Sequence, residues 1–147
     1  MSTNRRAFIA MTAAAGLAPL FSAQATEAEA AQAIKQIVGA AKIRTGRVDV
    51  EIPPLVENGN SVVMKVAVDS PMTQNDFVRA IHIVAEGNPL PNVVSFQLSH
   101  RSGRAAVTTR IRLNDSQRIW AIAQMSDGSF WQGHAATLVT LAACTEV

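Results

Sequence analysis

Cys144 is the only cysteine in the 147-residue chain and lies three residues from its end. With no second cysteine it cannot form a disulfide within the chain, so its thiol is incidental, reactive, or linked to another molecule. No basic residue neighbours it in the sequence to stabilise the thiolate, which is the nucleophilic form. The thiol is therefore a poor catalytic group in its own chain. On a chain end, however, it can enter another protein's active site as a tethered carrier of a covalently bound substrate.

The other residues that could hold a metal are widely spaced. His82, His100 and His134 are separated by 18 and 34 residues, which matches no short metal-binding motif. We expect each of them to lie in the core or at its rim. A blue-copper site needs a histidine and a methionine shortly after the cysteine, and only residues 145–147 follow Cys144.

Three methionines leave one further metal hypothesis open. Met64, Met72 and Met125 could bind copper(I) together with the histidines, although methionine on a strand more commonly fills the core. A copper-binding module is therefore an alternative function.

The sequence has no serine–histidine–aspartate arrangement, no Gly-rich phosphate loop and no carboxylate pair at a spacing typical of catalysis. We predict no catalytic residue, no cofactor and no metal site.

Trp120 and Trp131 flank a turn of the Asp-Gly type at Ser126–Gly128. We expect the two rings to face each other across this hairpin. Cross-strand packing explains such a pair, and so does a patch that binds a partner protein. The residues alone do not decide between the two.

The first 25 residues have the order of a bacterial export signal. Arg5-Arg6 is a twin-arginine pattern, an apolar run follows from Ala13 to Phe21, and Ala23-Gln24-Ala25 is a small-residue cleavage site. The apolar run is too short to span a membrane. Cleavage after residue 25 predicts a periplasmic protein delivered by the twin-arginine pathway.

The charge balance of the remaining chain argues against nucleic acid as a partner. The signal carries two of the 13 basic residues and none of the 11 acidic ones, so the rest of the chain has a net charge of about zero. A nucleic-acid-binding domain normally carries a basic patch. We therefore predict neither nucleic-acid nor membrane binding.

Residues 26–46 form a predicted N-terminal helical segment. Acidic residues open the stretch 26–41 and lysine lies later in it, as the helix dipole favours. Ala30, Ile34, Ile37 and Ala41 share one face at helical spacing. Because this stripe is narrow, we expect the helix to pack on an edge of the main domain.

Residues 47–141 predict a β-domain, followed by a cysteine-bearing tail at 142–147. Apolar and polar residues alternate in short runs that end at Gly, Asn, Asp and Pro, including an Asn58-Gly59 turn. This pattern is typical of an all-β, immunoglobulin-like antiparallel β-sandwich with a short N-terminal helix. Seven strands are expected, at 47–52, 62–69, 77–85, 93–100, 104–113, 118–125 and 130–141.

Several short motifs, in order along nearly the whole chain after the signal, resemble the SoxY family of sulfur carriers in thiosulfate oxidation. They are Glu57-Asn58-Gly59-Asn60, Val68-Asp69-Ser70-Pro71-Met72-Thr73, Asn88-Pro89-Leu90-Pro91, Arg101-Ser102-Gly103-Arg104, Thr109-Arg110-Ile111-Arg112-Leu113 and Met125-Ser126-Asp127-Gly128-Ser129-Phe130-Trp131.

The resemblance implies an immunoglobulin-like sandwich that catalyses nothing itself. It implies a heterodimer with SoxZ and three enzymes that act on the carried sulfur: a c-type cytochrome that couples thiosulfate to the thiol, a hydrolase that releases sulfate, and a sulfane dehydrogenase. Cys144 then corresponds to the family's sulfur-carrying cysteine, with a disulfide dimer through it as a further possibility.

The cysteine's surroundings differ from the family pattern. Ala142-Ala143-Cys144-Thr145-Glu146-Val147 stands where the family has Gly-Gly-Cys-Gly-Gly. Glycine gives such an arm conformational freedom, so alanine stiffens the approach to the thiol. An adaptor or structural subunit without carrier activity is therefore an alternative.

Overall fold

The computed structural model describes residues 27–143, which fold into one helix, one short 3-10 helix and nine strands. In chain order they are α1 Glu27–Val38, β1 Ile43–Thr45, β2 Val48–Glu51, β3 Leu55–Val56, β4 Val62–Val68, β5 Val78–Ala85, β6 Asn92–Gln97, η1 His100–Ser102, β7 Ala106–Ile111, β8 Gln117–Met125 and β9 Phe130–Val139. None of the helices in this part of the chain is long and apolar enough to cross a membrane.

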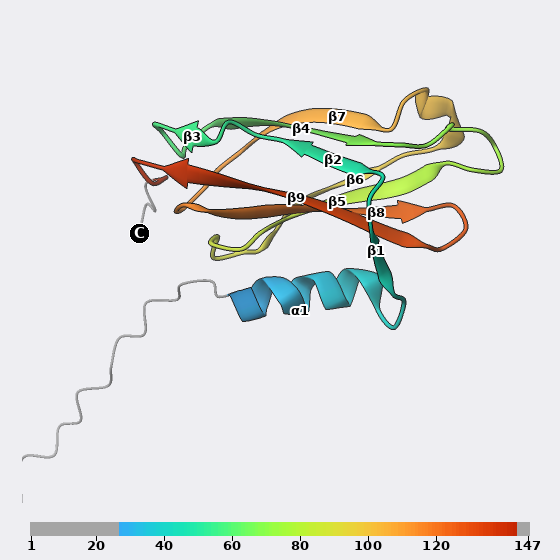
Figure 1. Cartoon of the computed structure of the whole chain (residues 1–147), viewed down its shortest axis with the longest axis horizontal. Coiled ribbons are helices and arrows are strands. Elements are labelled where there is room, and N and C mark those ends of the chain that lie inside the picture. Colours follow the sequence, from blue (N-terminus) through green and yellow to red (C-terminus); the bar gives the residue numbers. More distant parts are fainter. Residues whose placement is uncertain (1–26, 144–147) are drawn as a thin grey trace, which may run out of the picture.

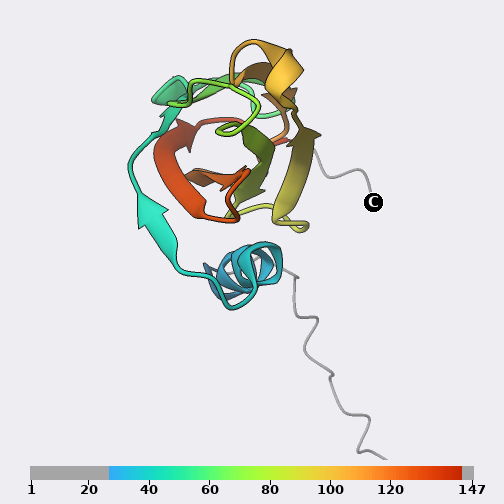
Figure 2. The same cartoon turned by 90° about the vertical axis from the view of Figure 1, so that its right-hand side faces the viewer.

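The strands form two sheets that pack face to face. One sheet has the order β1-β9-β8-β5-β6, with β3 also pairing to β9, and the other has the order β2-β4-β7. Figure 1 shows the two layers from the side, and Figure 2 shows them end-on around a common interior. The expected immunoglobulin-like sandwich is confirmed. Its pairings are antiparallel except that β1 and β3 each run parallel to β9.

The core lies between the sheets because alternate residues of the strands point inward. Along β4, Val62, Met64, Val66 and Val68 are buried while Lys65 is exposed. Strand β5 is different, because it is buried along most of its length and lies between β8 and β6. This central position agrees with the sequence of the strand, which is apolar on both faces apart from Arg79 and His82.

The outer face of the larger sheet is covered by α1, which lies outside the sandwich in both views (Figures 1 and 2). Val38 of the helix is buried with Ile122 and Phe130 of the sheet, and Ile34 and Ile37 pack against them. The helix was expected on an edge of the main domain, and it packs instead on the outer face of the larger sheet. The apolar stripe is narrow because only one face of the helix meets the sheet, and it does so on the neighbouring strands β8 and β9.

The strand count and several boundaries differ from the sequence-based prediction. β1 and β3 were not predicted, and they have only three and two residues, too few for alternation to be visible. The strand expected at 93–100 ends at Gln97, because Ser99 caps the 3-10 turn η1 that begins at His100. The strand expected at 104–113 is shortened to Ala106–Ile111.

Candidate functional site

The predicted sulfur-carrying residue, Cys144, lies outside the residues that the structure describes, as does the predicted export signal at 1–25. The structure describes the approach to the cysteine as far as Ala143. This approach, residues 140–143, is called here the tail root. It follows the end of β9, the strand that the sequence places directly before the cysteine.

Backbone hydrogen bonds hold the tail root to two neighbouring segments. The Thr140 N–H donates to the Val56 carbonyl at 3.0 Å and the Leu141 N–H to the Glu57 carbonyl at 3.2 Å. The Ala143 N–H donates to the Leu113 carbonyl at 3.0 Å. The chain is therefore fixed to the body of the protein at the residue that directly precedes Cys144.

Gly59 lies at the centre of these contacts. Its N–H donates to the Leu141 carbonyl, and its own carbonyl accepts from the Leu113 N–H, both at 2.8 Å. The turn expected at Asn58-Gly59 is present, but neither residue has the positive φ that this pair tolerates. Glycine is required here for a different reason. A Cβ on Gly59 would overlap the Leu113 carbonyl oxygen and lie 3.0 Å from the Ala143 nitrogen.

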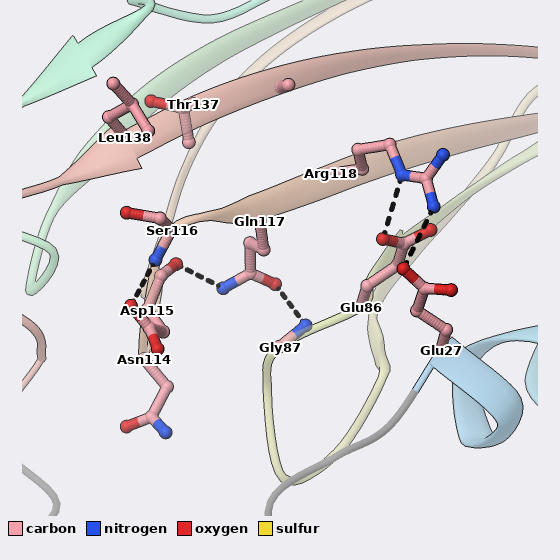
Figure 3. Close-up of a pocket in the computed structure, with 11 residues that line it drawn as sticks. Glu27, Glu86, Gly87, Asn114, Asp115, Ser116, Gln117, Arg118, Thr137 and Leu138 are labelled. Atoms are coloured by element: carbon pink, nitrogen blue, oxygen red, sulfur yellow. Dashed lines mark hydrogen bonds and ion pairs between the residues drawn. The ribbon is translucent and has the colours of Figure 1, made fainter.

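A cavity of about 590 Å³ opens beside the second half of β9, as Figure 3 shows. It lies between the start of α1, the segment after β5, the loop before β8, and Ala136–Leu138 of β9. Ser116 connects this cavity to the end of β9, directly before the tail root, because its hydroxyl accepts from the Val139 N–H at 2.8 Å. The Gln117 side chain closes the middle of the cavity wall, accepting from the Gly87 N–H at 2.7 Å.

The charged end of the cavity is a single linked group of side chains (Figure 3). Arg118 donates from Nε to Glu86 at 3.0 Å and from Nη2 to Glu27 at 3.3 Å. Glu86 also accepts from Trp120 Nε1 at 2.6 Å. The hydrogen bond and the charge of Glu86 raise the pKa of Arg118. Since two carboxylates already neutralise this arginine, and Asp115 lines the same cavity, the cavity does not favour an anionic ligand.

The three histidines are not brought together. His82 Nδ1 is 2.7 Å from Ser95 Oγ, His100 meets Phe77 edge-to-face, and His134 stacks on Trp120 with ring centroids 4.5 Å apart. Burial lowers the pKa of His82. Within residues 27–143 no group of three or more His, Cys, Asp or Glu side chains is placed to hold a metal ion.

The three methionines belong to the core between the sheets. Met64 and Met125 are each 1% exposed and Met72 is 7% exposed. The sulfur of Met72 accepts from the Val78 N–H at 3.4 Å. These positions fit the packing role that methionine commonly has on strands.

The prediction that Trp120 and Trp131 face each other was wrong. Trp120 lies opposite His134, and Trp131 lies opposite Ala123. Because Trp120 and Ala123 are an odd number of residues apart on β8, the two rings point to opposite faces of the sheet. Trp120 packs on the helix side and Trp131 on the core side. They therefore form no common patch.

Trp131 has cationic neighbours on the adjoining strand β1 and the turn after it. The guanidinium carbons of Arg44 and Arg47 lie 5.6 and 5.2 Å from its ring centroid. Its indole N–H is buried and has no hydrogen-bond partner among the residues described. The two arginines therefore contact the face of the ring, while its N–H is left without a partner in this part of the chain.

The sequence did not identify Gly59, Leu113 and Ser116 as neighbours of the tail root, nor Glu86 and Arg118 as an ion pair. The one available signal was the Asn58-Gly59 motif, which was interpreted as an ordinary turn. The other contacts join residues 23 to 91 positions apart and leave no local pattern.

The comparisons with known proteins agree with this fold. The structure is similar to that of the sulfur carrier protein SoxY from Chlorobium limicola f thiosulfatophilum, with a TM-score of 0.66 and 23% identity, over 79% of this chain and 100% of that chain. It is also similar to the superoxide reductase (neelaredoxin) of Ignicoccus hospitalis, with a TM-score of 0.56 and 19% identity, over 64% and 80% of the two chains. At these identities the likeness is one of fold. A comparison with curated proteins gave no match.

A family model decides the relationship at the level of sequence. The model for sulfur oxidation protein SoxY matches residues 34–144, which is most of the chain. The solved Chlorobium member is a sulfur carrier protein rather than an enzyme, in agreement with the non-enzymatic protein expected from the sequence. This chain belongs to the SoxY family of sulfur oxidation proteins.

Proposed function

We propose that this protein is the periplasmic carrier subunit of a thiosulfate-oxidising system and holds sulfur intermediates covalently on Cys144. The observation that carries the proposal is the family match, which extends from residue 34 to Cys144 itself. The carrier role of the Chlorobium protein of the same family supports it. The protein is exported by the twin-arginine pathway, as residues 1–25 predict.

The loading step joins the Cys144 sulfur to the outer sulfur of thiosulfate. One S–S bond forms, the thiol loses its proton, and two electrons leave, so that Cys–SH and S2O3²⁻ give Cys–S–S–SO3⁻, one proton and two electrons. The electrons pass to a c-type cytochrome. A hydrolase then removes the sulfonate as sulfate, and a sulfane dehydrogenase oxidises the sulfur that remains on the cysteine.

The geometry of the body supports a carrier rather than a site that binds thiosulfate by itself. The cavity beside β9 contains three carboxylates and a single arginine that is paired with two of them. Such a cavity repels a dianion. The chemistry therefore takes place on the tail, inside the active sites of partner proteins.

A SoxZ-like subunit is the proposed constant partner, in a heterodimer. The exposed leucines at the end of β9 support an interface with another protein, because Leu138 and its cross-strand neighbour Leu55 are 63% and 57% exposed. When no sulfur is bound, the Cys144 thiols of two carriers can also join in a disulfide dimer, losing two protons and passing two electrons to an oxidant of the periplasm such as a thiol oxidase.

Intact-mass measurement of the protein purified from periplasm tests the proposal directly. Cells oxidising thiosulfate should yield protein that carries sulfur or thiosulfonate adducts, and dithiothreitol should remove them. Cys144→Ser, produced in the same cells, should carry none. An unmodified thiol in wild-type protein from actively oxidising cells would overturn the carrier role.

One observation favours an adaptor without carrier activity as the second candidate. The tail root is fixed at Ala143, and alanine replaces the glycines that the family has before its cysteine. An adaptor predicts that Cys144→Ala leaves growth on thiosulfate unchanged. Loss of growth would exclude it.

A further inference from the structure

Three backbone hydrogen bonds close a small ring around the tail root. The Gly59 N–H donates to the Leu141 carbonyl, the Leu113 N–H donates to the Gly59 carbonyl, and the Ala143 N–H donates to the Leu113 carbonyl. The chain from Leu141 to Ala143 completes the ring. Gly59 and Leu113, with the Glu57 carbonyl that receives the Leu141 N–H, are called here the tail clasp.

The clasp depends on the missing side chain of Gly59. Gly59 is buried, and a Cβ at this position would overlap the Leu113 carbonyl oxygen and lie 3.0 Å from the Ala143 nitrogen. These two atoms are the acceptor and the donor of the bond that holds Ala143. An alanine at position 59 would therefore push apart the two groups that fix the tail. The φ of Gly59 is not positive, so the alanine backbone itself is not strained.

The tail root is held by its backbone rather than by buried side chains. Leu141 is 58% exposed and Ala142 is also exposed, so little apolar surface is removed from water here. Leu113, which supplies the acceptor for Ala143, is fully buried. The clasp thus joins the exposed tail root to a buried residue of the core. It adds little buried apolar surface to that core.

We propose that the tail clasp is a positioning device and that Gly59 is its positioning residue: it fixes the point at which Cys144 leaves the body of the protein. Consecutive Cα atoms are about 3.8 Å apart, so the residue that carries the thiol begins one peptide unit from a hydrogen-bonded anchor. The inference rests on the proposed carrier function and deepens it. It predicts that the partner enzyme engages the carrier at one defined place on its surface, next to the tail clasp.

A matched pair of glycine variants tests the clasp. Gly133 lies on β9, and a Cβ there would overlap a backbone oxygen, that of Val48, as closely as a Cβ on Gly59 would overlap Leu113. Gly59→Ala and Gly133→Ala therefore introduce similar strain at different places. Amide hydrogen exchange by NMR should be roughly tenfold faster or more at Ala143 in Gly59→Ala, and unchanged there in Gly133→Ala.

The functional readout separates positioning from stability. With the host's own oxidising enzymes, thiosulfate-dependent adducts on Cys144 should form roughly tenfold more slowly, or worse, in Gly59→Ala than in the wild type. Reaction of the same thiol with a small disulfide reagent should not slow. Gly133→Ala should load at the wild-type rate once the fraction folded is taken into account.

A second variant removes the hydrogen bond that anchors Ala143 without changing a residue of the tail clasp. Ala143→Pro deletes the N–H that donates to Leu113, and it should slow enzymatic loading in the same way even if Gly59→Ala fails to fold. Wild-type loading rates in both folded variants would overturn the positioning role. A wild-type protein that never acquires adducts, but whose Ala143 amide is protected through Gly59, would instead contradict the carrier function and leave the clasp intact.

Discussion

At the scale of single residues, Glu86 is a largely buried carboxylate that accepts from two side-chain donors. Its side chain is 13% exposed, and its two oxygens accept from Arg118 Nε and Trp120 Nε1 at 3.0 and 2.6 Å. Arg118 also reaches Glu27 at the start of α1. One carboxylate thereby joins the end of β5, the strand β8 and, through the arginine, the N-terminal helix.

We expect Glu86→Gln to lower the free energy of unfolding by about 1–3 kcal/mol. The amide keeps one acceptor oxygen, but its NH2 group then faces Arg118 or Trp120, so one donor loses its partner in a largely buried place. Urea unfolding followed by tryptophan fluorescence measures the change.

Glu51→Gln is the control for this change. Glu51 pairs with Lys65 at 3.7 Å, and the two side chains are 69% and 58% exposed. Exposed pairs of this kind contribute about 0–1 kcal/mol. If the two substitutions had equal effects, the bonds of Glu86 would not be stabilising beyond those of a solvated ion pair.

The site could be predicted at this scale only where a residue is chemically unusual in itself. Cys144 stands out because it is the single cysteine and lies near the end of the chain. Gly59 and Leu113 act through backbone atoms, whose partners lie 82 and 30 positions away in the sequence. No residue type or spacing records such contacts, so the clasp could not be found before the fold was known.

At the scale of elements, α1 and the outer face of the larger sheet share a second, smaller core. Phe130 at the start of β9 is 6% exposed and packs with Ile122 and Val38. The sequence predicted the helix and its apolar stripe, because helical spacing is visible locally. It did not predict the face on which the helix packs, since residues of β8 and β9 are needed to complete that surface.

We expect Phe130→Ala to destabilise the protein by about 3–5 kcal/mol, because it removes a buried ring from this second core. Thermal or urea unfolding checks the value. Leu138→Ala is the control on the same strand and the same sheet face. Leu138 is 63% exposed, so its truncation should change stability by no more than about 0.5 kcal/mol.

A small effect of Phe130→Ala would mean that α1 is not held on the sheet by this cluster.

The hairpin that precedes Phe130 behaves as its sequence predicts, since Gly128 has a φ of 86°. The facing of the two tryptophans was nevertheless predicted wrongly. A turn motif shows that two strands pair, but which residues lie opposite depends on the count of residues in the connection.

At the scale of the whole molecule, the fold is completed by its last strand. β9 pairs with β8, and it also pairs with β1 and β3 from the beginning of the domain, at Ile43↔Phe130 and Leu55↔Leu138. Contacts between residues so far apart in sequence carry a large loop-closure cost and slow folding. The larger sheet can therefore be completed only after β9 has been synthesised.

Replacing Arg5 and Arg6 by lysine should stop this export. We expect the precursor to remain in the cytoplasm with residues 1–25 attached, and its domain to resist protease there because the sandwich folds without the signal. Cell fractionation, intact mass and limited proteolysis measure location, processing and folding separately.

The control is lysine at Arg110 and Arg112, which should leave export unchanged. These two arginines lie in and just beyond β7, and their side chains are exposed. Normal delivery of the Arg5 and Arg6 double variant to the periplasm would show that the arginine pair does not direct export. A protease-sensitive precursor would show instead that β9 does not close the sheet before export.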